Sequence, residues 1–566
     1  MKFFDLLRKK WFGGQAGNTS KKDVEHSENL PDWNCLLNND NKMWSAAKVN
    51  AKNGPNILIA TTVGGFAALS SLESVLAVAL TLRGARVHTL LCDAALPTCL
   101  RVEYPSIPDP QVIADYGIQE KLCDSCQQTG NYLFEPLGLQ NHKLSDLLDA
   151  SSFQRAKQLA SEVPLEKIPT FLLDGVAVGE HAYAGALRYF ASGNLEKEAL
   201  GEQVVRRYFE AAILTAEGVK QLTHQFQFES SCFNHGIYCP QGVVGEVLRK
   251  VDTRIVNWNI AYRKKCFIFS HEDTYHHTLL DEPVEAWESI PWNSEIEAEI
   301  SEYLSSRRQG SNDWIWFHEK PDERFDRITS ELGLDNTKPI IGMLTNVMWD
   351  AQLHYRANAF PSMLSWVIDT IEYFINRPEL QLVIRIHPAE VRGTLPSRQP
   401  LLDEIHKVWQ ELPQNIKIIA PESQISTYAV MEHCDSVLIY GTKTGVELTS
   451  IGIPVIVAGE AWVRNKGITL DASTREEYIE LLNDLPLGER LDEETRLRAL
   501  KYAYHFFYRR MIPLDFMEPT GAWPPYCPSI KSLEQLMPGA DSGLDLVCDG
   551  IMKQSPFVYP AERFQE

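Results

Sequence analysis

The stretch YGTKTGVELTSIGIPVIV, residues 440–457, sets a run of glycine and threonine between two short apolar segments. SVLIY leads into it and IPVIVAG closes it, and both are β-branched apolar runs that suit strands buried on both faces. The run between them opens a short helical segment that carries one acidic residue, Glu447. The stretch therefore predicts a strand, a loop, a helix and a second strand, the repeating unit of a parallel α/β sheet.

The loop of this unit is a candidate ligand site. In a parallel crossover, the carboxyl end of the strand and the amino end of the helix meet in the crevice where open α/β sheets bind ligands. Backbone N–H groups from residues 442–446 would point into that crevice, ready for an anionic group. The alternative is that Thr442 or Thr444 only caps the helix, while Gly441 and Gly445 ease a tight turn.

Strand and helix patterns recur on both sides of this unit. NILIATTVGGF, a helical pattern and RGARVHTLLCD predict a βαβ opening with a right-handed crossover. After an acidic and aromatic stretch, the rhythm resumes at residue 339 with IIGMLTN, LQLVIRIHP and NIKIIAP. We therefore expect an α/β chain with two Rossmann-like, doubly wound parallel-sheet domains facing a cleft. The expected divisions are an N-terminal extension at 1–53, a first domain at 54–337, a second at 338–485, and a helical segment at 486–566 that packs back on the first domain.

Charge and hydrophobicity exclude several classes of protein. The net charge of −21 weighs against a nucleic-acid-binding surface, which would need clustered Lys and Arg. No run approaches the ~20 apolar residues needed to cross a bilayer, and no signal-peptide core is present, so a cytoplasmic protein is expected. The stretch MKFFDLLRKKWF at residues 1–12 mixes large apolar and basic side chains. It suits either a helix lying on the inner face of an anionic membrane or a frayed basic terminus.

Four of the eleven cysteines fall in two pairs close together in the sequence. Cys92 and Cys99 lie in CDAALPTC, and Cys123 and Cys126 lie in CDSC. Because stable disulfides are not expected in the cytosol, the two pairs indicate a thiolate metal site, with structural zinc as the first choice. The first pair is spaced more widely than is usual for zinc. The alternative is four ordinary buried thiols.

Four loops of the second domain should meet at its crevice, because each follows a predicted strand. TNVMWD, RIHPAE, the opening stretch and EAWVRNKGITLD together supply cations, N–H donors and acceptors, the set that the phosphates and ribose of a nucleotide sugar need. The predicted donor-binding residues are Asn346, Asp350, Arg385, His387, Glu390, Thr442, Thr444, Gly445, Glu447, Arg464 and Lys466. Glu447 would accept from the ribose diol, and His387 with Arg464 or Lys466 would neutralise phosphate. No Asp-x-Asp triplet occurs, so no catalytic metal is expected.

These motifs resemble a known family. TNVMWDAQ, RIHPAE and YGTKTGVELTSIGIPVIVAGEAWVRNKGIT are similar to the capsule polysaccharide biosynthesis proteins, which include Kdo transferases. The resemblance covers residues 338–470 well and the first domain only loosely, through HGIYCPQG and FSHEDTYHH. It implies a GT-B glycosyltransferase that takes a CMP-, UDP- or GDP-linked sugar and a glycan or lipid-linked acceptor. It also implies that His387, Thr442, Thr444 and Glu447 contact the nucleotide.

An inverting transfer would need a general base from the first domain. The candidates are Asp174 and Glu180 in LLDGVAVGEH, His235 in NHGIY, and Asp273 in SHEDTYHH. Asp174 is favoured because it follows a predicted strand directly and precedes a glycine. Helix capping for Asp174 and a solvated helix face for Glu180 are the alternatives.

Two other functions fit the same patterns. A polyol-phosphate transferase of the teichoic-acid type would use a similar second domain and move a glycerol phosphate. A non-catalytic component of a capsule assembly complex would bind a nucleotide sugar or a glycan without turning it over.

Overall fold

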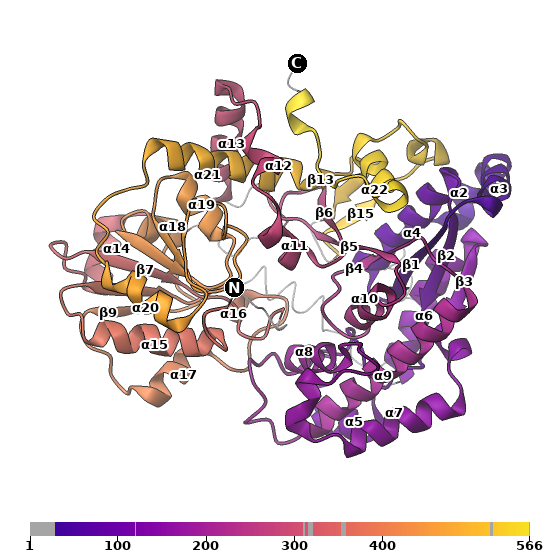
Figure 1. Cartoon of the computed structure of the whole chain (residues 1–566), viewed down its shortest axis with the longest axis horizontal. Helices are drawn as coiled ribbons and strands as arrows, with labels where there is room; N and C mark the ends of the chain where they lie inside the picture. Colours follow the sequence, from indigo (N-terminus) through magenta and orange to yellow (C-terminus); the bar gives the residue numbers. More distant parts are fainter. Residues whose placement is uncertain are drawn as a thin grey trace. The chain divides into compact units, whose positions relative to one another are not determined.

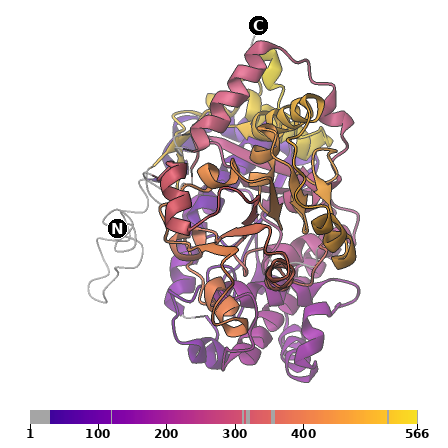
Figure 2. The ribbon, with the colours of Figure 1, turned by 90° about the vertical axis from the view of Figure 1, so that its left-hand side faces the viewer.

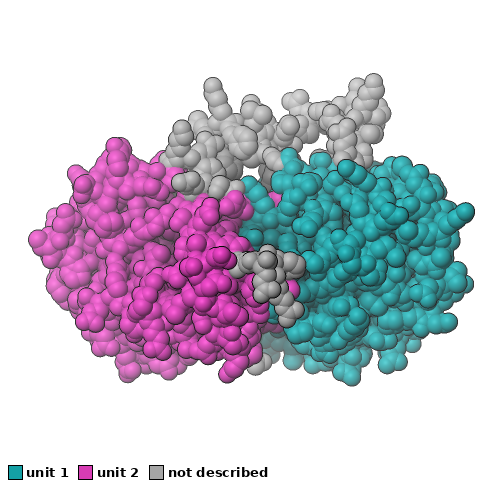
Figure 3. Space-filling view, turned by 90° about the horizontal axis from the view of Figure 1, so that it is seen from above, with its two compact units in different colours: residues 1–190, 194–275, 511–559 teal, residues 191–193, 276–510, 560–566 magenta. Residues whose placement is uncertain are grey.

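The computed structural model describes residues 29–118, 120–308, 312–314, 321–351, 358–520 and 524–564 (Figure 1). The basic stretch at residues 1–12 lies outside the described residues. The chain forms two compact units (Figure 3): residues to Phe190, Asn194–Tyr275 and Met511–Tyr559 make unit 1, and the remainder, chiefly His276–Arg510, makes unit 2. The predicted boundary at 337/338 falls inside unit 2, and the predicted C-terminal segment is shared between the units.

Unit 1 is built on a seven-stranded sheet in the order β13-β6-β5-β4-β1-β2-β3. The β6 and β13 strands pair antiparallel with their neighbours, and the other pairs are parallel. Along the chain, strands are added outward from β1 on one side and from β4 on the other, so the winding reverses between these two strands. The bounds are β1 Asn56–Thr62, β2 Arg86–Leu91, β3 Gln140–Lys143, β4 Ser230–Asn234, β5 Arg254–Ile260, β6 Cys266–His271 and β13 Met511–Pro513.

Helices cover this sheet, and the C-terminal part of the chain covers one of them. Helix α4 is buried along almost its whole length because α22 and β15 pack against it, and the hydroxyl of Tyr526 donates to the carbonyl of Ala68. The helices and short strands of unit 1 are α2 Trp33–Asn39, α3 Asn41–Asn50, α4 Ala67–Leu82, α5 Pro110–Tyr116, α6 Glu120–Phe134, α7 Ala150–Glu162, α8 Val178–Phe190, α9 Gly201–Gln225, α10 Gln241–Arg249, α22 Ser542–Lys553, β14 Met517–Pro519 and β15 Tyr526–Pro528.

Unit 2 carries a six-stranded, wholly parallel sheet in the order β12-β11-β10-β7-β8-β9. Here the winding reverses between β7 and β10. Helices α15 and α20 lie on one face and α18 and α19 on the other (Figures 1 and 2). The strands are β7 Ile340–Leu344, β8 Gln381–Arg385, β9 Ile416–Ile419, β10 Ser436–Ile439, β11 Val455–Val457 and β12 Leu470–Asp471.

The helices of unit 2 show the local signals that begin them. Ser362 and Ser365 form a reciprocal capping box at the start of α15, and Asp492 caps α21. The helices are α11 Tyr275–Asp281, α12 Glu285–Glu288, α13 Ser294–Arg307, α14 Phe325–Leu332, α15 Met363–Ile375, α16 Ala389–Arg392, α17 Leu401–Val408, α18 Thr427–Met431, α19 Thr444–Ser450, α20 Arg475–Asn483 and α21 Glu493–Tyr504.

The predicted fold class is confirmed: the chain is α/β, with two Rossmann-like sheets, and residues 436–457 form the strand, loop, helix and strand that the sequence predicts. One predicted strand is wrong. The segment before Asp174 begins as a 3-10 helix, Leu165–Thr170, and continues to an isolated bridge between Leu173 and Val176. Pro169 cannot donate to a strand ladder, which explains the difference. Within the described residues, no helix is long and apolar enough to cross a membrane.

Candidate functional site

The loops after β7 and β10 meet at the point where the winding of the unit 2 sheet reverses. Asn346 follows β7, and its Oδ1 accepts the backbone N–H of Gly441, which follows β10, at 3.2 Å. Ligands of open α/β sheets bind at this point, outside the carboxyl ends of the strands. The loops after β7 and β10 therefore contact each other at the place where a ligand is expected.

The loop after β8 joins the same edge of the sheet. The backbone N–H of His387 donates to Thr345 Oγ1 at 3.1 Å, and its Nδ1 accepts the N–H of Ala389 at 3.0 Å. A neutral imidazole that accepts at Nδ1 carries its proton on Nε2. His387 is half-buried, and Nε2 is the ring nitrogen that carries the donor hydrogen.

The hydroxyl-rich loop before α19 is tied to itself. Thr442 Oγ1 donates to Thr444 Oγ1 at 3.2 Å and accepts the N–H of Thr444 at 3.4 Å. Gly445 has a packing reason to be glycine, because a Cβ there would lie 2.7 Å from Ile439 Cδ1. Packing against Ile439 therefore explains this glycine without a role in donor binding.

Glu447 is not placed as predicted. Its carboxylate is 5% exposed: Oε1 pairs with Arg307 Nε at 3.2 Å and Lys443 Nζ at 3.4 Å, and Oε2 accepts the hydroxyl of Tyr428 at 2.5 Å. Burial alone would raise the pKa of Glu447, but Arg307 and Lys443 hold it below its ordinary value. Both oxygens serve an internal network, so the structure does not support a ribose-binding role.

Two of the predicted phosphate-binding cations are also buried in internal contacts. Arg464 is 2% exposed and donates to the carbonyl of Gly459 at 3.1 Å and to Ser473 Oγ at 2.7 Å. Lys466 is fully buried, and its ammonium donates to two backbone carbonyls at the end of α11, at 3.1 and 2.9 Å. These contacts correct the prediction, because such cations stabilise the fold rather than face a ligand.

The RIHPAE segment also contains charged side chains that are buried in internal contacts. Arg385 is 2% exposed, and its guanidinium donates to the carbonyl of Ala420 and to Thr427 Oγ1. Glu390 is also 2% exposed, and its Oε2 accepts the first N–H of α17, from Leu401, at 3.1 Å. Arg385 and Glu390 therefore serve the fold, and His387 is the polar side chain of this segment that lies at the crevice. Asp350, in the loop after β7, lies in an exposed turn.

Glu390 gives a testable pH effect. Burial, opposed by the Leu401 N–H, raises its pKa from 4.5 to about 7. Between those values the native state keeps a proton that the unfolded chain releases, so stability falls as pH rises, by about 1.4 kcal/mol per pH unit. Glu390→Gln is expected to remove most of this slope from the denaturant unfolding of unit 2 measured between about pH 4.5 and about pH 7. Glu411→Gln, which changes an exposed carboxylate just after α17, should keep the slope. An unchanged slope in Glu390→Gln would contradict the assignment.

Sequence reasoning missed two parts of this site. Glu460 follows β11 and begins the predicted loop EAWVRNKGITLD, but it was not among the predicted site residues. Its backbone N–H donates to Asn358 Oδ1 at 2.9 Å, and its place directly after IPVIVAG is the signal that could have found it. Arg307, the partner of Glu447, lies on α13, far from the motifs in sequence. No local sequence pattern predicts that contact.

In unit 1, Asp174 lies away from the carboxyl edge of the sheet. It pairs with Lys220 at 2.7 Å and Arg155 at 3.6 Å, and Lys250 lies beside the neighbouring Gly175. Lys220 and Lys250 sit at the carboxyl ends of helices that lead into β4 and β5, so this is the amino edge. The hydrogen bond from Lys220 also holds the pKa of Asp174 below its usual range. Asp174 is therefore wrongly placed for a general base.

His235 is better placed. It follows β4 directly, at the point where the unit 1 winding reverses, with φ 63° and its ring stacked on Tyr238. Burial, aided by the charge of Arg188, lowers its pKa to about 4, so the imidazole is neutral near pH 7 and can accept a proton. Glu180 lies half-buried in the first turn of α8, on a helix rather than in a loop at the carboxyl edge of the sheet. The sequence missed Glu73, a buried acid that accepts the N–H of Asn234 at 2.9 Å.

The four clustered cysteines do come together in unit 1. All four line one cavity, beside Arg101 and four aliphatic side chains, Val63, Leu96, Ile118 and Leu122. None of the four forms a disulfide. In the described part of the chain, however, no three His, Cys, Asp or Glu side chains are placed to hold a metal ion. The structure therefore does not support the predicted site for a single zinc ion.

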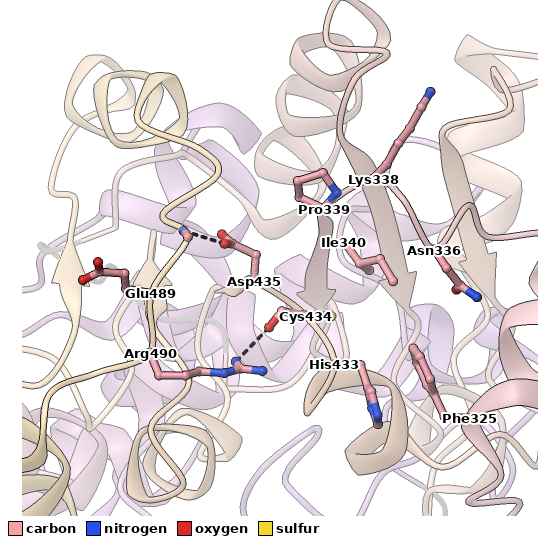
Figure 4. Close-up of a pocket in the computed structure, with 11 residues that line it drawn as sticks. Phe325, Asn336, Lys338, Pro339, Ile340, His433, Cys434, Asp435, Glu489 and Arg490 are labelled. Carbon is pink, nitrogen blue, oxygen red and sulfur yellow. Dashed lines mark hydrogen bonds between the residues drawn. The ribbon is translucent and has the colours of Figure 1, made fainter.

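A different pocket opens at the amino ends of β7 and β10 (Figure 4). Its polar groups serve the backbone around it: Asp435 accepts the N–H groups of Leu487 and Gly488, and Arg490 donates to the carbonyl of Cys434. This is the edge opposite the crevice of a parallel sheet, so we do not assign it to the predicted donor.

Residues 311–484 match the family model of the capsule polysaccharide biosynthesis protein. No curated protein matches the sequence significantly. A solved beta Kdo 2,4 transferase of Thermosulfurimonas dismutans KpsC shares 12% identity, and the match covers 50% of this chain and 80% of that one, with a TM-score of 0.31. A solved beta Kdo 2,7 transferase of the same KpsC shares 14% identity, and the match covers 56% of this chain and 88% of that one, with a TM-score of 0.32.

A third solved structure, the UDP-GlcNAc 2-epimerase of Neisseria meningitidis bound to UDP-GlcNAc, shares 10% identity. It covers 78% of this chain and 94% of its own, with a TM-score of 0.23. TM-scores of this size carry no argument about function. The family match covers the crevice loops of unit 2 described above, so residues 311–484 are similar to the capsule polysaccharide biosynthesis proteins, as the motifs predict.

Proposed function

We propose that the chain is a glycosyltransferase that moves a sugar from a nucleotide-activated donor during synthesis of a capsular or related surface polysaccharide. The observation that carries the proposal is the family match at residues 311–484, which spans the predicted crevice of unit 2. The acceptor is a growing glycan or a lipid-linked glycan, and the transfer needs no catalytic metal.

The crevice loops support a donor site with fewer residues than the sequence predicts. His387 supplies an Nε2–H donor for phosphate, because its Nδ1 is held by the backbone. Asn346 and the Gly441 loop, joined at 3.2 Å, shape the floor beneath the nucleotide. The hydroxyls of Thr442 and Thr444 lie beside them and complete the polar lining.

The chemistry on the donor side is stabilisation of the leaving nucleotide. Negative charge builds on the phosphate oxygens as the glycosyl bond breaks, and donors fixed in advance lower the energy of that state. In this proposal, buried Arg464 and Lys466 keep the loops after β11 rigid instead of touching phosphate. The electrostatic role falls to His387 and the backbone amides of the crevice.

The donor assignment predicts a loss of nucleotide binding in His387→Ala. Removing one charge-assisted hydrogen bond costs about 1.5–3 kcal/mol, so affinity for the responding nucleotide should fall about 10- to 100-fold. A thermal-shift titration of the full chain with CMP, UDP and GDP nucleotides measures this, because a ligand at about 100 times its Kd stabilises the native state by about 2.7 kcal/mol.

The matched control is His406→Ala, which removes an exposed histidine from α17 in the same unit. It should bind nucleotide like the parent. Equal binding by His387→Ala and the parent would reject the donor site, and no response of the parent to any nucleotide would reject the proposed donor class. Product analysis by mass then separates glycosyl from polyol-phosphate transfer.

A further inference from the structure

The pocket at the amino ends of β7 and β10 has the size of a ligand site (Figure 4). Its volume is about 420 Å³, within the range of about 300–1,000 Å³ that ligand pockets usually span. Four segments of unit 2 line it: Phe325 at the start of α14, residues 336–340 leading into β7, residues 433–435 leading into β10, and residues 488–490 after α20. The pocket therefore lies within one unit, at the edge of the sheet opposite the loops that we assign to the donor.

Hydrogen bonds hold two walls of this pocket in place. The carboxylate of Asp435 accepts the backbone N–H of Gly488 at 2.7 Å. The guanidinium of Arg490 donates to the carbonyls of Glu432 at 2.7 Å and Cys434 at 2.8 Å. These contacts tie the loop after α20 to the turn before β10 (Figure 4). Because the walls are fixed in advance, a ligand has little ordering to impose when it binds.

Other polar side chains of the lining have hydrogen-bonding groups that are not used. Among the residues that the structure describes, the exposed Asn336 amide and Glu489 carboxylate form no hydrogen bond or ion pair. The ammonium of Lys338 has three N–H groups and donates one hydrogen bond, to a backbone carbonyl at 2.9 Å. His433 Nδ1 donates to a backbone carbonyl of α18 at 2.9 Å, so Nε2 of the neutral ring is an acceptor. The lining therefore offers both donors and acceptors to a ligand.

This combination suits an uncharged ligand that is rich in hydroxyl groups. A hydroxyl both donates and accepts, so it can bond to an amide, a carboxylate and an ammonium. The charged side chains of the lining are two cations and two carboxylates, and their formal charges cancel: Lys338, Arg490, Asp435 and Glu489. A phosphate would need an excess of cations. In the described part of the chain, no three His, Cys, Asp or Glu side chains are placed to hold a metal ion.

Aromatic and apolar side chains complete the lining. Phe325 and His433 are stacked, with their ring centres 3.5 Å apart and their planes at 9° (Figure 4). Phe325 is half-buried, and Pro339 and Ile340 add apolar surface to the same pocket. An aromatic ring offers a large, rigid apolar face. A sugar ring carries hydroxyls at its rim and C–H groups on its faces, so it fits a pocket that joins such a ring to unused polar groups.

We propose that this pocket binds an uncharged segment of a glycan, with Asn336 and Glu489 bonded to sugar hydroxyls and Phe325 packed against one sugar ring. The choice of a glycan among hydroxyl-rich ligands rests on the proposed function, whereas the pocket and its lining do not. β7 has five residues, so at about 3.3 Å per residue the pocket lies about 16 Å from the donor crevice. A glycan bound here leaves the donor loops free, and the site retains the polymer between transfers.

The test is affinity electrophoresis of the full chain in native gels that contain the surface polysaccharide of the producing cell. Each protein is compared with itself in a gel without polysaccharide, so that a change in its own charge cancels. The parent should be retarded more strongly as the polysaccharide concentration rises. Asn336→Ala and Glu489→Ala should each weaken binding about 3- to 10-fold, because each removes hydrogen bonds to the sugar. Both side chains are exposed and make no contacts of this kind within the described residues, so both variants should fold.

The matched control is Glu476→Ala, which removes an exposed carboxylate of α20 outside the pocket and should bind like the parent. A parent that is not retarded would overturn the proposal, and so would equal retardation of the parent and both pocket variants. A nucleotide-induced thermal shift that disappears in Asn336→Ala would assign the pocket to a nucleotide instead. The donor site is judged separately, by the thermal shift of His387→Ala, so the two proposals fail in different measurements.

Discussion

His235→Asn is expected to lower kcat for sugar transfer by about 10²- to 10⁴-fold, the usual contribution of a general base. The imidazole follows β4 at the reversal point of the unit 1 sheet, and burial with Arg188 lowers its pKa to about 4. It is therefore neutral over the range in which a transferase works and can take the proton of an acceptor hydroxyl. Asparagine is chosen because His235 has φ 63°, a left-handed conformation that asparagine tolerates well.

The measurement is the steady-state rate of the full chain with a responding donor and a glycan acceptor. Donor binding by thermal shift should not change, since His235 and His387 belong to different units. The acidic limb of the parent rate profile, near about pH 4, should disappear in the variant. His224→Ala, an exposed histidine on α9, serves as the control. A His235→Asn enzyme with parental kcat would remove His235 from the mechanism.

Arg307→Met is expected to lower the free energy of unfolding by about 3–5 kcal/mol. Arg307 is 7% exposed, and its guanidinium pairs with Glu447 at 3.2 Å and with Asp313. The carboxylate of Asp313 also accepts the hydroxyl of Tyr303 at 2.8 Å. Without Arg307, buried Asp313 loses this cation and Glu447 keeps only Lys443 as a cationic partner. A buried charge that loses its partner costs far more than the ion pair contributes. Denaturant unfolding that follows unit 2 measures the loss.

The neighbouring Arg308→Met is the matched control. Its side chain is 35% exposed and pairs with Glu432, an arrangement worth about 0–1 kcal/mol. The double variant Arg307→Met with Glu447→Leu should lose less than the sum of its two single variants, because both charges of the pair are gone. A loss for Arg307→Met no larger than that for Arg308→Met would show that the network is not stabilising.

The same network has a defined pH dependence. The folded-state pKa of Glu447 lies below the ordinary 4.5, so its stabilisation is present above about pH 4.5 and is lost as the pH falls below that value. The difference in stability between the parent and Arg307→Met should therefore shrink in acid. Glu390, with its pKa raised to about 7, acts in the opposite direction.

The loop positions were predictable, but the direction of each side chain was not. The loops that carry Asn346 and His387 lie at the carboxyl edge of the unit 2 sheet, because parallel strands end at one edge. The same rule placed Arg385, Arg464 and Lys466 there as well, yet each side chain is buried in backbone contacts. The place of a residue relative to a predicted strand indicates where its Cα lies. It does not indicate the direction of a long Arg or Lys side chain, which can turn toward any carbonyl within its reach.

By itself, the sequence determined the two largely parallel sheets and the loops at their carboxyl ends, because β-branched runs, glycines and helix patterns act over a few residues. Only the tertiary structure decided which charges face a ligand. Arg307 reaches Glu447 from α13, 140 residues earlier in the chain (447 − 307), and Lys466 reaches the end of α11. Such pairs form because a buried charge must find a partner, and packing, which is not written in any local pattern, selects that partner.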